Sequence, residues 1–297
     1  MSEPAVLDDG KGEAGAASPE RWWLLGAVVA ALLAIFVGRT ALAIRGYAPR
    51  LPDVFDTLIV AGAALVLLQG YGSLKRADWL AAAGLGMFLG FQLPYATLFQ
   101  PFPYMDVARE AWSQGLVRAL FTTVAALGGL VIARRGGPVQ MQLADGAWRR
   151  ALVSFGFGAV VGVPLAVLNA FANAWTQGRP WLWQNPWAAA LDALQPAVFE
   201  EVVYRLALLG LLWLVLHRAW PARQAAWLAG ALSLLVHAYG GHFSDEFITQ
   251  PVATLVMGGV MGLIWGLPLT VLALRRNLDS AVGFHWVLDF ARFWAGF

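Results

Sequence analysis

Residues 199–216 read FEEVVYRLALLGLLWLVL, so two adjacent carboxylates and an arginine directly precede an uninterrupted apolar run. Ionisable side chains inside a membrane span are functional candidates by default, because burying a charge in a bilayer is costly. Glu201 and Arg205 are four residues apart, so they share a helix face and are expected to form a structural ion pair. Glu200 is rotated by about 100° from Glu201 on a helix. It can therefore point into a cavity and serve as a general base.

The composition of the chain places most of the protein in the membrane. Of its 297 residues, 59% are hydrophobic and 13% are charged, whereas soluble domains have about 45–50% and about 25%. These values exclude a soluble globular enzyme, a disordered chain and a fibrous repeat. The absence of cysteine excludes disulfides and thiolate sites. A net charge of +2 without a basic stripe indicates that nucleic acid is not a partner.

Apolar runs of about 20 residues, long enough to span a bilayer, recur along the chain. We expect an all-α, polytopic membrane helix bundle of about eight to nine transmembrane helices. Residues 1–20 are predicted to be a disordered polar tail, 21–150 the N-terminal helices, and 151–297 the C-terminal helices, with the catalytic core in 187–297. Pro196 should kink or start a helix, leaving the piece before it re-entrant or interfacial. The predicted spans are 22–44, 54–70, 79–98, 116–133, 150–171, 187–217, 223–240, 252–274 and 278–297.

The basic residues between the predicted spans suggest an orientation. If the N-terminus lies inside, the inner segments carry twelve lysines and arginines and the outer segments carry five. Cytoplasmic loops are enriched in these residues. We therefore expect an integral membrane protein with a cytoplasmic N-terminus.

Two further apolar segments carry histidine. His237 ends one run, with His242 in the Gly-rich loop beyond it, where we expect an interface residue. His285 and Asp289 are four residues apart, on one face of the last predicted helix. A carboxylate and a histidine can activate water, while a second histidine stabilises an oxyanion. Two histidines and a carboxylate could equally hold zinc, although the sequence has no His-Glu-x-x-His helix.

Together the three segments resemble the CAAX prenyl endopeptidase family, also called the CPBP or abortive-infection family of intramembrane proteases, which includes the Ras-converting enzyme. The family's motifs are Glu-Glu-x-x-x-Arg, Phe-x-x-x-His, and His-x-x-x-Asn or Asp. They are matched in order by Glu200, Glu201 and Arg205, by His237, and by His285 and Asp289. The sequence departs from the second motif at Ser233, where the family has phenylalanine. The resemblance covers about residues 187–297.

The resemblance implies a role for each matched residue. Glu200 would be the general base that activates water, assisted by His237, and His285 with Asp289 would stabilise the oxyanion. Asp289 would either donate to the oxyanion as a protonated acid or orient His285. Glu201 and Arg205 would be a supporting pair. The family has been described both as glutamate-dependent and as metalloprotease-like. We favour no obligatory cofactor; a divalent metal such as zinc, if present, would be held by Glu200, His237 and His285.

The implied substrate is a membrane-associated peptide or protein, with the lipid bilayer as the other partner. The Ala-, Trp- and Arg-rich, nearly Lys-free composition is typical of a high-GC bacterium. We therefore expect the bacterial inner membrane and no prenylated CAAX substrate. Two alternatives stay open: a proton-coupled transporter, since carriers also bury Glu, Arg and His, and a non-catalytic immunity or scaffold protein of the same fold.

Overall fold

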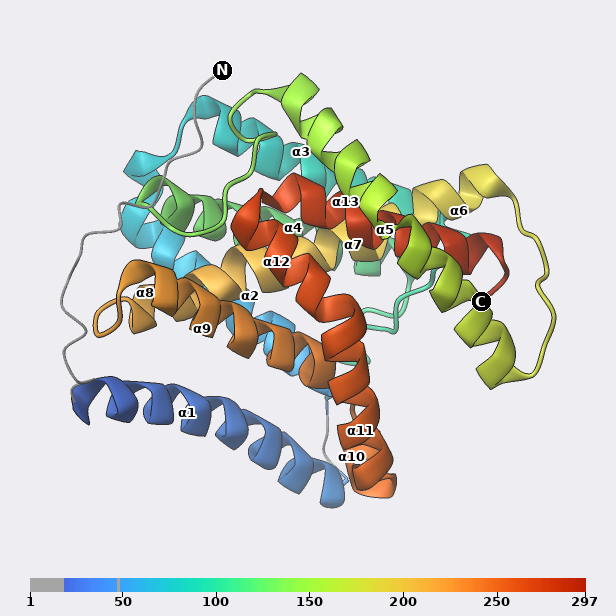
Figure 1. The fold of residues 1–297 in the computed structure, drawn as a ribbon, viewed down its shortest axis with the longest axis horizontal. Helices are drawn as coiled ribbons and strands as arrows, with labels where there is room; N and C mark the ends of the chain where they lie inside the picture. The colour runs from blue at the N-terminus through green and yellow to red at the C-terminus, as the bar shows by residue number, and fades with distance from the viewer. Residues whose placement is uncertain (1–18, 47–48) are drawn as a thin grey trace.

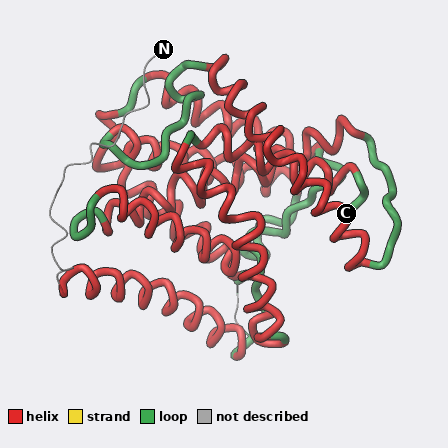
Figure 2. The backbone as a smooth tube through the Cα atoms, viewed as in Figure 1, coloured by secondary structure: helices red, strands yellow, loops and turns green. Residues whose placement is uncertain are grey.

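The apolar segments form helices in the computed structural model, which describes residues 19–46 and 49–297 (Figures 1 and 2). The described residues contain no strand, and the fold is an all-α membrane bundle. The predicted polar tail lies outside the described residues except for Pro19 and Glu20, which begin the first helix. The long helices are α1 (Pro19–Ile44), α2 (Leu51–Gly70), α3 (Arg76–Gln92), α4 (Ala111–Arg134), α5 (Trp148–Gln177), α9 (Ala222–Leu235), α11 (Pro251–Met261) and α13 (Leu278–Trp294). The shorter ones are α6 (Pro186–Asp192), α7 (Leu194–Glu200), α8 (Leu209–Leu216), α10 (Glu246–Thr249) and α12 (Leu267–Arg275).

Five helical segments are long and apolar enough to cross a membrane: Pro19–Ile44, Leu51–Ser73, Ala111–Arg134, Trp148–Gln177 and Pro251–Arg275. The other predicted spans form shorter or interrupted helices. Within one of them, residues 201–210 are all buried and pack inside the bundle. The protein is therefore an integral membrane protein whose C-terminal half is built partly from broken helices.

The long 187–217 segment is divided just before Pro196. Helix α6 ends at Asp192, and α7 starts anew at Leu194 after a turn at Ala193. Pro196 thus lies in the first turn of α7, where its missing N–H removes no helical hydrogen bond. This break confirms the predicted helix start and fixes the direction in which α7 presents Glu200.

Three π-helical segments follow in the C-terminal half: η3 (Glu201–Leu208), η4 (Val236–Gly241) and η5 (Gly262–Gly266). A π-helical turn contains more residues than an α-helical turn, so it changes the direction of the side chains around it. Such turns occur frequently at functional sites. Here η3 follows Glu200 and holds Glu201 and Arg205, while η4 holds His237.

Helices α5 and α13 lie side by side because glycines remove the side chains between them (Figure 1). A Cβ atom at Gly158 would collide with the carbonyl oxygen of Ser280, and one at Gly283 with the carbonyl of Phe155. Small residues allow this close approach in lipid, where packing drives association. The contact positions α13, which carries His285 and Asp289.

Replacing Gly158 by valine should destabilise the protein by about 1–3 kcal/mol, because the new side chain must push α13 away from α5. Thermal unfolding in detergent measures the effect. Gly156→Val is the matched control, since a Cβ at Gly156 meets no atom within 4 Å. Equal unfolding temperatures for the two variants would contradict the tight packing.

Helix α1 covers one side of the bundle and is mostly exposed, as expected for a lipid-facing helix (Figure 1). It contacts the rest of the protein near both of its ends. Near the first turn, Trp22 packs edge-on against Trp220 with 5.3 Å between ring centroids. Near the last turn, Arg39 forms an ion pair of 2.7 Å with Asp245.

Candidate active site

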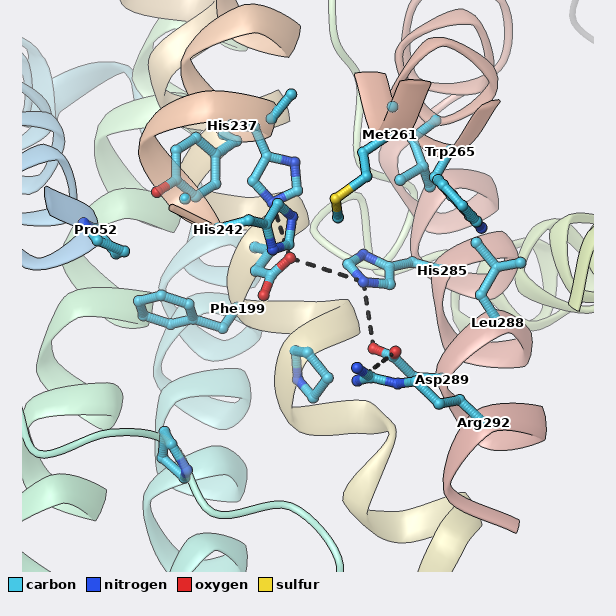
Figure 3. A pocket seen from close by; sticks show the side chains of 18 of the residues that line it. Pro52, Phe199, His237, His242, Met261, Trp265, His285, Leu288, Asp289 and Arg292 are labelled. Carbon is cyan, nitrogen blue, oxygen red and sulfur yellow. Dashed lines mark hydrogen bonds and ion pairs between the residues drawn. The ribbon is translucent and has the colours of Figure 1, made fainter. Parts of the chain in front are cut away.

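Side chains from all three motifs line one cavity of about 540 Å³ (Figure 3). Glu200 reaches it from the end of α7, His237 from η4, and His285 and Asp289 from α13. Arg205 also lines the cavity, whereas Glu201 lies behind the wall and is fully buried. The structure thus brings together the groups that the sequence separates by up to about a third of the chain.

Glu200 lies between two imidazoles. Its Oε2 atom is 2.8 Å from Nε2 of His237 and 3.7 Å from Nε2 of His285. The Glu200 side chain keeps 23% of its surface exposed to the cavity. A water molecule in the cavity can therefore reach the carboxylate, which the two rings hold in place.

His237 is held in one tautomer by Arg205. A guanidinium can only donate hydrogen bonds, so Nδ1 of His237, which contacts NH1 of Arg205, must accept. The ring proton therefore lies on Nε2, from which it is donated to Glu200. Because its only basic nitrogen is occupied, His237 orients Glu200 rather than acting as a base itself.

His285 faces carboxylates with both ring nitrogens. Nδ1 is 2.9 Å from Oε1 of Glu201, and Nε2 is 3.3 Å from Oδ2 of Asp289. A carboxylate only accepts hydrogen bonds, so this arrangement favours an imidazole that carries protons on both nitrogens. Asp289 also forms an ion pair of 2.8 Å with Arg292. These contacts favour the orienting role of Asp289 over that of an oxyanion donor.

The supporting pair connects the two histidines. Glu201 and Arg205 are both inaccessible to solvent and lie 3.5 Å apart. Glu201 bonds to His285, and Arg205 bonds to His237. The ion pair in the first motif therefore sets the position of the histidines in the second and third motifs.

Two residues near His237, Tyr204 and Asp56, match none of the motif positions and were not predicted as site residues. Tyr204 donates to Asp56 at 2.9 Å, and its ring lies 4.4 Å from the ring of His237, centroid to centroid. Asp56 belongs to α2, and Arg118 of α4 also lines the cavity. The N-terminal helices thus contribute polar groups to the cavity as well as wall. The sequence signal was present, since Asp56 and Arg118 are charges inside predicted spans.

The ligand set expected for a metal differs from the set that the structure groups. Glu200, His237 and His242 offer ligand atoms within 4.8 Å of one another, so His242 takes the place predicted for His285. A metal on Nε2 of His237 would force the ring proton onto Nδ1, opposite the donating Arg205. This donor arrangement does not fit a metal ion.

Comparison with known proteins gives one family match. The model of the Rce1-like family, type II CAAX prenyl endopeptidases, matches residues 181–291. This range contains all six motif residues, and it supports the assignment to the CAAX protease family made from the sequence.

One relative carries a different name. Over 214 residues the chain is 27% identical to a phosphatidylglycerol–prolipoprotein diacylglyceryl transferase of Gluconacetobacter diazotrophicus, a match that covers 65% of this chain and 70% of that protein. No solved structure matches the chain.

Proposed function

We propose that this protein, whose residues 181–291 match the Rce1-like CAAX prenyl endopeptidases, hydrolyses peptide bonds with water activated by Glu200. The family match supports a CAAX-type intramembrane endopeptidase in general. The observation that carries the mechanism is the position of Glu200, which faces a cavity between His237 and His285.

In the proposed reaction, Glu200 takes a proton from a water molecule as the water oxygen attacks the peptide carbonyl carbon. The carbonyl oxygen becomes an oxyanion, which accepts a hydrogen bond from the Nε2–H of His285. Glu200 then passes its proton to the amide nitrogen as the C–N bond breaks. The products are a carboxylic acid and an amine, and Glu200 returns to its carboxylate form.

The other polar residues would act through these two groups. Glu201 holds the His285 ring by Nδ1, and Asp289 lies 3.3 Å from Nε2, so the Nε2–H would turn from Asp289 to the oxyanion as the oxyanion forms. Arg205 keeps the proton of His237 on the side of Glu200. A fixed arrangement of donors lowers the reorganisation needed in the transition state.

The cavity wall suits a membrane-associated peptide. Apolar side chains from several helices face the cavity and can bind the apolar residues of a substrate in extended form. They include Phe99, Phe102, Met257, Met261, Trp265 and Leu269. We propose a bacterial inner-membrane location and a membrane-associated substrate that carries no prenyl group.

Peptide cleavage by the purified protein tests the function. Wild type should cleave membrane-associated peptides, and both Glu200→Ala and His237→Ala should lose cleavage. Glu110→Ala is the matched control, because Glu110 lies exposed in a loop outside the cavity. Cleavage by both active-site variants at the wild-type rate would refute the proposal.

Further measurements separate the alternatives. A proton-coupled transporter would take up protons in vesicles with its substrate and lose that uptake in Glu201→Gln. A non-catalytic immunity or scaffold protein would keep its biological role in Glu200→Ala. A phosphatidylglycerol–prolipoprotein diacylglyceryl transferase, as the similar protein is named, would transfer a diacylglyceryl group from phosphatidylglycerol to a prolipoprotein instead of cleaving a peptide bond.

Removing metal ions should leave peptide cleavage unchanged, because a metal on Nε2 of His237 would move the ring proton to Nδ1, which already accepts a hydrogen bond from Arg205. The measurement is the cleavage rate before and after prolonged incubation with EDTA or phenanthroline. His242→Ala should likewise retain the wild-type rate. Loss of activity on chelation, with recovery on adding zinc, would show that the metal set is used.

A further inference from the structure

The cavity lies toward one end of the bundle. Helix α9 begins at Ala222, next to the basic residues Arg218 and Arg223, and the chain reaches His237 only after the helix ends. Helix α13 likewise follows Arg275 and Arg276 and carries Asp289 near its far end. In both cases the cavity residues lie away from the basic connection.

In the N-terminal helices, too, the cavity residues lie away from the basic connections, but here the chain runs from the cavity toward the basic end. Helix α2 starts beside the cavity with Asp56 and ends before Lys75, and α4 starts beside it with Arg118 and ends at Arg134. The basic residues of the predicted inner segments that the structure describes, from Arg21 to Arg276, therefore gather at the end of the bundle that is remote from the cavity.

The contacts of helix α1 give the distance between the basic end and the cavity end of the bundle. Trp22 contacts Trp220 in the basic connection between α8 and α9, and Arg39 pairs with Asp245 in the loop after His242. At about 1.5 Å per residue, Trp22 and Arg39 are about 25 Å apart along the helix. This distance approaches the thickness of the hydrocarbon core, about 30 Å. The two loops thus lie at opposite ends of the bundle, nearly the thickness of that core apart.

The end near the cavity is also its polar entrance. Helix α5 starts beside Arg149 and Arg150, and its last turns contribute Asn169, Asn173 and Thr176 to the cavity lining. Exposed Gln100 lines the cavity from the loop between α3 and α4. Water and an extended peptide can enter between these groups.

The loop that forms this entrance is anchored by a buried carboxylate. Asp192 of α6 accepts backbone hydrogen bonds from Thr97 at 2.8 Å and Leu98 at 2.7 Å. The following residues, 99–102, line the cavity. The entrance is therefore a constructed part of the fold at the end remote from the basic loops.

We propose that the active site opens on the non-cytoplasmic side of the membrane, and that the substrates are exported chains cleaved in segments beside the outer surface. Lysines and arginines concentrate in cytoplasmic loops, which places the basic end inside and the cavity entrance outside. The substrate class rests on the proposed peptidase function. The orientation itself does not.

Single-cysteine labelling tests the orientation, since the chain contains no cysteine. Gln100→Cys and Thr176→Cys mark the cavity entrance, and Ala222→Cys and Gly72→Cys mark exposed positions at the basic end. In spheroplasts, a membrane-impermeant maleimide should label the first two variants, and the last two only after permeabilisation. The reverse pattern would overturn the proposal.

The substrate side is tested separately with a single-spanning reporter that carries one cleavable segment either outside or inside the membrane. Wild-type protein should cleave only the outside version, and cleavage of the inside version alone would overturn the proposed substrate class. Labelling needs no catalysis, so the expected labelling with neither reporter cleaved would refute the peptidase function and leave the orientation standing.

Discussion

The Glu200→Gln variant should hydrolyse peptides about 10²- to 10⁴-fold more slowly than wild type, the range over which a positioned general base contributes to a reaction. Glutamine has nearly the same shape as glutamate, and its carbonyl oxygen can still accept the hydrogen bond that His237 donates at 2.8 Å. Only the ability to take a proton from water is lost. The measurement is kcat/KM for an internally quenched membrane peptide.

Two comparisons make this result specific. The unfolding temperature of Glu200→Gln should equal or exceed that of wild type, because the substitution removes a partly buried charge and keeps its hydrogen bond. Glu110→Gln applies the same chemical change to an exposed loop residue and should leave kcat/KM unchanged. A Glu200→Gln variant that retains the wild-type rate in a folded protein would exclude Glu200 as the base.

The Glu201→Ala variant should lose about 3–5 kcal/mol of stability, the usual cost of removing one partner of a buried ion pair. Arg205 is fully buried, and its Nε and NH2 atoms already have no hydrogen-bond partner among the residues that the structure describes. In wild type the Glu201 carboxylate, 3.5 Å away, compensates the buried charge of the guanidinium. In the variant that charge stays buried without this carboxylate. His285 also loses the partner of its Nδ1 atom. Thermal or denaturant unfolding in detergent measures the loss.

A double variant separates stability from positioning. Glu201→Leu with Arg205→Met replaces both charges by apolar side chains of similar size, which is often neutral or stabilising. It should recover most of the stability that Glu201→Ala loses. It should still be inactive, because neither histidine keeps the partner that orients it. An active double variant would show that the pair has no positioning role.

Many residues of the site could be predicted from the sequence because this protein is surrounded by apolar lipid. In a lipid-facing chain, charges such as Glu200 and Asp289 inside apolar runs stand out at once. The helix start near Pro196 was equally predictable, because the missing N–H of proline is a local property of the chain.

Partners in space could not be predicted in the same way. The expected metal set contained His285, whereas the structure groups His242 with Glu200 and His237. Which histidine approaches which carboxylate depends on the π-helical segments and on the packing of α5 against α13. The number of uninterrupted spans was also not readable from hydropathy, since buried and lipid-facing apolar residues look alike in a sequence.

The sequence by itself determined that this is a helical membrane protein, that the residues of its three motifs lie in the C-terminal half, and that its basic residues gather in alternate connections. These properties depend on residue type and spacing along one chain. Only the tertiary structure decided that Glu201 and Arg205 each hold one histidine, that Asp56 reaches Tyr204, and that the residues lining the cavity lie away from the basic end. Hydrogen bonds across helices depend on how the helices pack, and no single segment encodes that.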